Sequence, residues 1–246
     1  MIKFFRKIRQ SLINENKMGR YFKYAIGEII LVVIGILIAL QINNWNQKRL
    51  NRKKEISYLE EIKTSLESDT TRISEVPDFN VRKDSIVKNF MRIFDAKLSN
   101  EERMEIVDSY SKPFTRYDSF KPKATTWNNF ISAENINLIT NKDLRTQLME
   151  YYSFNYDGSV QERIKIMNRK VIDENFHQFF TKEYTLKSLN IDTEFPTNTE
   201  FKLHLNQQLL SDLFGIRFIM NLQNEFLNDT NERVETLIDL LNKEIQ

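Results

Sequence analysis

The residue types that most often carry out catalysis are scarce in this chain. Its 246 residues include no cysteine and two histidines, His177 and His204, which excludes thiol catalysis, disulfides and cysteine-based metal sites. No H-E-x-x-H or G-x-S-x-G motif occurs, and the five glycines have neither phosphate-loop nor dinucleotide-binding spacing. We therefore expect no catalytic residues, no metal ligands and no cofactor.

The isolated titratable residues have simple structural interpretations. His177 lies among Phe176, Phe179 and Phe180, so we interpret it as a core or boundary residue rather than a base. Adjacent acids such as those at 60–61 point apart on a helix and are typical of a solvated face.

Aromatic residues gather at Tyr151, Tyr152, Phe154 and Tyr156. This cluster could line a ligand pocket, although aromatic clusters in helical domains more often form part of the core. Both interpretations remain open, and the core is favoured.

The elements that would position these residues are helices. The sequence is 41% hydrophobic and 28% charged, with 5 Gly and 4 Pro, which disfavours folds built on tight turns. No alternation typical of strands persists, whereas apolar residues recur every three or four positions. The prediction is an all-α protein: an N-terminal single transmembrane helix followed by a helical bundle with long, coiled-coil-like helices.

Several helix boundaries follow from the pattern. A helix should continue from the membrane to about residue 75 and end at Pro77. Residues 80–97 predict a second helix with Val81 inward, and a capping box at Ser99–Glu102 begins a third. Further helices are expected from Trp127, after a cap within residues 140–143, and over 158–184, with loops at 112–123 and 185–199.

The C-terminal helix has the clearest pattern, an alternation of three- and four-residue steps. Its members are Leu213, Ile216, Met220, Gln223, Leu227, Thr230, Val234, Leu237 and Leu241. This seam fits coiled-coil packing or the core face of a bundle helix, and the bundle is favoured. The helix over residues 50–75 is its expected antiparallel partner.

Residues 24–45 predict a transmembrane helix. The span from Tyr24 to Trp45 is roughly 32 Å at 1.5 Å per residue, close to the ~30 Å hydrocarbon thickness of a bilayer. No small-x-small cleavage site follows it, so we favour an uncleaved span over a signal peptide. Aromatic residues expected to anchor it at the two interfaces are Tyr21, Phe22, Tyr24 and Trp45.

Three residues of this span share one helical face: Glu28, Gly35 and Ala39. The two small residues would allow close helix–helix approach, with Glu28 hydrogen-bonding a neighbour, and so support a possible homo-oligomer. Alternatively, Glu28 reaches the headgroups and the small residues are incidental.

Charge is segregated along the chain. Residues 1–46 carry seven basic and two acidic residues, and residues 47–55 carry five basic residues and one acidic residue. The remaining residues include 24 basic and 31 acidic ones. Residues 1–23 predict a basic amphipathic segment on the anionic cytoplasmic leaflet, which places the C-terminal domain, residues 46–246, in the periplasm. The acidic body disfavours nucleic acid as a partner.

The N-terminal stretches IKFFRKIRQ and KYAIGEIILVVIGILIALQINNWN resemble the signature of an uncharacterised family of single-pass membrane proteins found in Bacteroidota. The segment WNNFISAENINLITNKDLRTQLMEYYSF resembles a less specific pattern of the same family, with Ala133 where relatives often have glycine. The resemblance implies a bacterial inner-membrane protein and carries no catalytic residue across.

Two classes of function remain. The favoured one is a non-enzymatic interaction or scaffold module that presents a helical bundle to an unidentified protein partner. The alternative is a ligand-responsive sensor or accessory subunit that signals through a partner. The second needs a cytoplasmic output, and about 23 residues are too few for an effector domain. An enzyme is the third choice.

Overall fold

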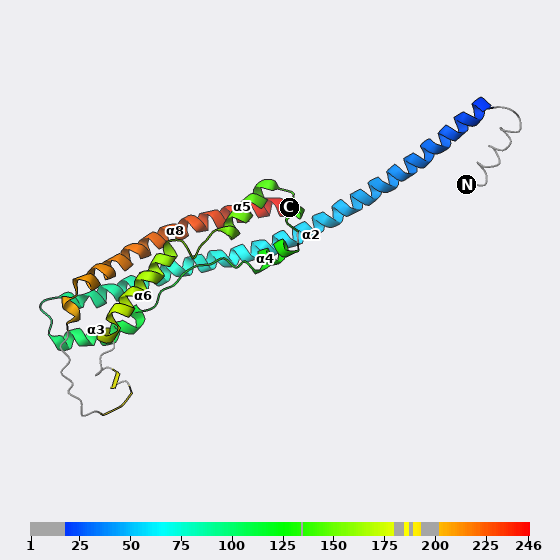
Figure 1. Ribbon diagram of the computed structural model, residues 1–246. Helices are drawn as coiled ribbons and strands as arrows, with labels where there is room; N and C mark the ends of the chain where they lie inside the picture. The colour runs from blue at the N-terminus through cyan, green and yellow to red at the C-terminus, as the bar shows by residue number, and fades with distance from the viewer. Residues whose placement is uncertain (1–17, 134, 180–184, 187–188, 193–201) are drawn as a thin grey trace. The chain divides into compact units, whose positions relative to one another are not determined.

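The computed structural model describes residues 18–133, 135–179, 185–186, 189–192 and 202–246 (Figure 1). All regular elements in these ranges are helices: the fold is all-α. The amphipathic segment expected over residues 1–23 lies mostly outside the described residues, as does most of the loop expected over 185–199.

The chain divides into two compact units, Met1–Ser57 and Tyr58–Gln246. Helix α2 (Met18–Met91) contributes to both units. The remaining elements belong to the second unit. They are η1 (Arg92–Phe94), α3 (Asn100–Phe114), α4 (Thr125–Ser132), η2 (Asn135–Leu138), α5 (Lys142–Ser153), α6 (Val160–Phe179), η3 (Leu203–Leu205) and α8 (Gln207–Ile245).

Helix α2 is long and apolar enough to cross a membrane. None of its most apolar stretch is buried against the described part of the chain. Its exposed apolar side chains run from Ile29 to Ile42 with few interruptions. A helix whose apolar residues face outward all round needs an apolar surrounding, which a bilayer supplies.

The prediction that Pro77 ends the first helix is wrong, because α2 continues through it to Met91. A proline inside a helix removes one hydrogen bond and costs roughly 3 kcal/mol. Burial of Ile73, Val76 and Asn80 on either side of Pro77 holds the helix together there. The separate helix expected over 80–97 is therefore the end of α2 followed by η1.

Two further expectations need correction. Val81 is 68% exposed, and Val87 is buried instead on that part of α2. His177 is exposed on α6, so it is neither a core nor a boundary residue. In both cases the buried face of the helix differs from the face that the apolar residues nearby in the sequence suggested.

Helix caps follow the sequence closely. Ser99 and Glu102 form the expected capping box, with Glu102 N donating to Ser99 Oγ at 3.2 Å and Ser99 N donating to Glu102 Oε2 at 2.7 Å. The cap expected at Thr140–Asp143 is instead made by Asn141, whose Oδ1 accepts from the backbone N of Asp143 and Leu144 in the first turn of α5. α3 extends to Phe114, so the loop predicted from residue 112 begins slightly later.

The C-terminal part of α2 and α8 lie side by side and antiparallel (Figure 1). Asn80 of α2 donates to Gln223 of α8, and Asp84 of α2 accepts from Arg217 of α8 at 2.5 Å. The predicted seam of α8 is buried at all nine positions, from Leu213 to Leu241. The bundle packing and the antiparallel partner are both confirmed.

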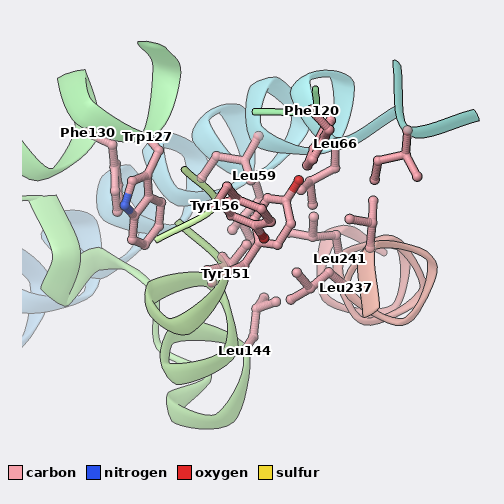
Figure 2. Packing of buried hydrophobic residues seen from close by; sticks show 14 of the residues in the cluster. Leu59, Leu66, Phe120, Trp127, Phe130, Leu144, Tyr151, Tyr156, Leu237 and Leu241 are labelled. Atoms are coloured by element: carbon pink, nitrogen blue, oxygen red, sulfur yellow. The ribbon is translucent and has the colours of Figure 1, made fainter. Parts of the chain in front are cut away.

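The second unit has two hydrophobic cores. The first joins the start of the unit's α2 segment with α4, α5 and the end of α8, and Figure 2 shows Tyr151 and Tyr156 near its centre with leucines of α2 and α8 around them. The second core joins the end of α2 with α3, α6 and the beginning of α8.

A set of buried polar side chains, here called the polar layer, lies between these cores on α2 and α8 and extends onto α6. Its members are Asn80, Lys83, Gln161, Asn168 and Gln223. Gln223 Nε2 donates to the carbonyl oxygen of Asp118 at 3.1 Å, and Gln161 bridges both backbone groups of Phe120. Such hydrogen-bonded side chains favour one helix register, because a shifted register would leave them unpaired.

Lys83 is the charged member of the polar layer. Its Nζ donates to the backbone oxygens of Phe114 and Arg116 and to Asn168 Oδ1, and it lies 4.8 Å from the ring centroid of Phe114. No carboxylate among the described residues pairs with it, and burial lowers its pKa to about 7. Lys83 thus joins α2, α6 and the segment after α3 through hydrogen bonds alone.

Candidate binding cleft

A cleft of about 870 Å³ lies between the end of α5 and the middle of α8. Its lining residues are Gln147, Glu150, Tyr151, Ser153, Phe154, Tyr156, Asp229, Glu232, Arg233, Thr236 and Leu237. Clefts of this size are in the range that protein ligands occupy.

One wall of the cleft is aromatic and comes from the junction of α5 and α6. Tyr151 lies in the last turn of α5, and Phe154 follows the helix in an extended conformation. A tight turn after it is held by Asn155 Oδ1, which accepts from Gly158 N at 2.9 Å. A Cβ at Gly158 would lie 2.3 Å from the Asn155 amide nitrogen, so a larger residue at this position would displace the Asn155 side chain that holds the turn.

The aromatic wall is partly fixed and partly open. Tyr151 and Tyr156 are each 6% exposed, whereas Phe154 is 44% exposed and packs against Tyr156 at 4.9 Å between ring centroids. Phe226 of α8 lies 5.9 Å from Phe154. Phe154 is therefore a supported aromatic surface that a ligand can contact.

Asp69 fixes the position of Tyr151 from behind. The Tyr151 hydroxyl donates to Asp69 Oδ2 at 2.9 Å, and the other carboxylate oxygen accepts from Lys123 N at 2.9 Å. Burial raises the pKa of Asp69, and the two hydrogen bonds oppose that rise. Burial also raises the pKa of Tyr151, with the Asp69 charge adding to the effect, so the phenol stays protonated.

A charged wall of the cleft comes from Asp229, Glu232 and Arg233 of α8, and Glu150 of α5 adds a further carboxylate. None of these four side chains has a hydrogen bond or salt bridge with another residue in the described ranges. Arg233 lies close enough to Tyr156 to oppose the rise in its pKa that burial produces. The cleft thus combines an aromatic wall with charges of both signs that are available to a ligand.

Each of the two interpretations of the aromatic cluster, core and pocket lining, holds for some of its residues. Tyr151 and Tyr156 belong to the core, as favoured, and together with Phe154 they also line the cleft. Tyr152 stacks on Trp127 at 5.0 Å and does not line it.

The residues singled out in and beside the apolar stretch of α2 are distant in sequence from the cleft. Three of the expected interfacial anchors are exposed: Phe22 by 60%, Tyr24 by 55% and Trp45 by 65%. The fourth, Tyr21, belongs to α2, and its side chain is not among those that the structure describes. Gly35 and Ala39 are exposed and Glu28 is half-buried. A Cβ added at Gly35 would meet nothing within 4 Å, so this face is open in the single chain.

Sequence reasoning missed Asp69, Asn80 and Lys83. Each continues the alternating three- and four-residue steps of the buried face of α2, which runs through Leu66 and Val76. A polar residue at such a position signals a buried hydrogen-bonded group. The same signal in α8 did single out Gln223.

Comparison with known proteins identifies one relationship. A family described as a family of unknown function, DUF6090, matches residues 28–198. That range is more than half of the chain. The chain belongs to this family. The match includes the aromatic wall of the cleft and stops before α8, which supplies the charged wall. None of the curated proteins and none of the solved structures matches the chain.

The described residues contain no group of three or more His, Asp or Glu side chains arranged to hold a metal ion. The arrangement of the cleft suits binding: an aromatic surface for apolar groups, carboxylates for cations and a guanidinium for an anion.

Proposed function

We propose that this DUF6090 protein is a membrane-anchored, non-enzymatic interaction module. In this proposal α2 crosses the inner membrane of a bacterium once, with the N-terminus in the cytoplasm and the bundle in the periplasm. The observation that carries it is the apolar stretch of α2, whose side chains are exposed all round. Exposed apolar surface of this extent is stable only in lipid or against another protein.

We place the partner in the cleft between α5 and α8. A protein segment suits this cleft better than a small apolar molecule, because the cleft is open and lined by unpaired charges. Phe154 would contact apolar side chains of the partner, and Arg233 and the three carboxylates would select its charges.

Site-specific photocrosslinking in native membranes tests this proposal. A photoreactive phenylalanine analogue at Phe154, which is 44% exposed, should give a discrete crosslinked product. The same analogue at Tyr117 is the matched control, since Tyr117 is 41% exposed and does not line the cleft.

A second substitution ties that product to the cleft. Arg233→Glu reverses the one positive charge in the cleft and should abolish the Phe154 crosslink while leaving the abundance of the protein unchanged. Crosslinks that are the same at both positions, or that persist in Arg233→Glu, would contradict binding in this cleft.

The sensor alternative keeps one supporting observation. α2 is a single helix that belongs to both units, and a helix can transmit a displacement along its axis. A sensor requires that occupation of the cleft changes the membrane end of α2. With Ile26→Cys in two copies of the chain, a sensor predicts that Arg233→Glu changes the yield of the disulfide crosslink. A scaffold predicts the same yield with and without Arg233→Glu.

A further inference from the structure

Five basic residues follow directly after the apolar stretch of α2, and we call them the basic collar. They are Lys48, Arg49, Arg52, Lys53 and Lys54. Lys48, Arg49, Lys53 and Lys54 are exposed, and Arg52 is partly exposed. The collar occupies less than two helical turns, so its charge is concentrated within about 11 Å along the helix axis.

Trp45 fixes the depth of the collar. Its side chain is 65% exposed, and an exposed indole on a transmembrane helix is typical of the lipid–water interface. The guanidinium carbon of Arg49 lies 5.6 Å from the centroid of the Trp45 ring, and Arg49 Nη2 donates to Asn46 Oδ1 at 3.3 Å. These two contacts hold the guanidinium one turn beyond the indole, at the level of lipid headgroups.

The collar keeps a large positive charge. The one acidic residue between positions 47 and 55 is Glu55, which accepts from Arg52 at 2.8 Å and is 1% exposed. The other four cations have no salt bridge within the described part of the chain.

Membrane orientation does not account for these charges. Five cations on the side of the bundle oppose the orientation that the seven basic residues of positions 1–46 favour. If the bundle is periplasmic, the charge of the collar does not serve to set the orientation.

We propose that the basic collar binds the phosphate groups of anionic phospholipids on the bundle side of the membrane. This inference rests on the proposed membrane span. Lysine and arginine side chains next to Trp45 can reach the headgroup phosphates, and each cation near an anionic surface contributes up to about fivefold in binding. The short length of the collar suits lipid headgroups better than a nucleic-acid backbone, which needs a longer basic track.

Fluorescence quenching by brominated lipids tests this inference on the full-length protein. The protein is placed in phosphatidylcholine vesicles that contain a minority of phosphatidylglycerol, with bromine on the chains of one lipid or the other. Trp45 reports the adjacent lipid, because Trp127, the second tryptophan, is 6% exposed inside the bundle. A Trp45→Phe variant supplies the background. We expect quenching per brominated lipid to be at least about fivefold stronger with phosphatidylglycerol.

The collar variant is Lys48→Gln/Arg49→Gln/Lys53→Gln, which spares Arg52 so that the buried Glu55 keeps its partner. It should bring the quenching by the two lipids close to equal. High salt should have the same effect on the wild-type protein, because it screens exposed charges. The matched control removes three exposed cations of the bundle, Arg82→Gln/Lys112→Gln/Lys142→Gln, and should keep the wild-type preference.

The outcomes separate this inference from the proposed membrane span. Equal quenching by both lipids in the wild-type protein, or an unchanged preference in the collar variant, overturns the lipid site and leaves the span intact. Absence of quenching of Trp45 by either lipid overturns both.

Discussion

The side-chain amide of Asn80 in α2 donates to Oε1 of Gln223 in α8 at 2.8 Å, across 143 positions of the sequence. This bond lies between the two hydrophobic cores, where apolar side chains alone would allow the antiparallel helices to slide by a turn. Gln223 is fully buried and Asn80 nearly so, which makes a shift that separates them costly. The pair therefore determines how α8 is aligned with α2.

Replacing Gln223 alone should destabilise the protein more, relative to the number of hydrogen bonds lost, than replacing Gln223 and Asn80 together. Gln223→Leu leaves the Asp118 carbonyl without this donor and removes one acceptor of Asn80, which should lower the free energy of unfolding by about 1–3 kcal/mol. The double variant Asn80→Leu/Gln223→Leu should recover part of that loss. Chemical denaturation of the full-length protein in detergent, followed by circular dichroism, measures both. A double variant as unstable as the sum of the two single variants would contradict a coupled pair.

Lys83 predicts a dependence of stability on pH. Its pKa falls from 10.5 to about 7 in the folded protein, so the unfolded chain binds more protons between these values. Stability should therefore rise with pH between 7 and 9, by up to about 1.4 kcal/mol per pH unit. Lys83→Met should remove this slope whatever its absolute stability, because the titrating group is gone. Equal slopes for the two proteins would show that the buried ammonium keeps an ordinary pKa.

Gly35→Leu tests the helix-packing face of the membrane segment. A Cβ added at Gly35 meets nothing within 4 Å, so we expect any effect on association to arise between molecules. If Glu28, Gly35 and Ala39 pack against a second helix, Gly35→Leu should cost about 1–2 kcal/mol of association and Glu28→Gln should cost less. A transmembrane association assay measures both, with Ile34→Leu as the control at an exposed apolar position. Unchanged association would leave α2 as a plain anchor.

Membrane orientation has a direct test. Alkaline phosphatase fused after Gln246 should be active, and a reporter that fluoresces only in the cytoplasm should be dark at the same position. The expectation follows from the seven basic residues that precede the end of the apolar stretch. The reverse pair of signals would place the bundle in the cytoplasm.

Much of the fold could be predicted from the sequence because it depends on local patterns. The apolar stretch of α2, the capping box at Ser99 and the nine-position seam of α8 are each visible within a few helical turns. The antiparallel pairing of α8 with the helix that contains residues 50–75 was also predicted.

Tertiary packing decided the features that local pattern could not. Pro77 stays inside α2 because Ile73 and Val76 before it are buried in the first core and Asn80 after it bonds to Gln223 of α8, and no local signal reports that support. The cleft exists because the turn after Phe154 brings an aromatic wall opposite charged residues more than seventy positions further along the chain. Periodicity shows which face of a helix is buried, whereas the residues that meet across two helices depend on the register, which here the polar layer sets.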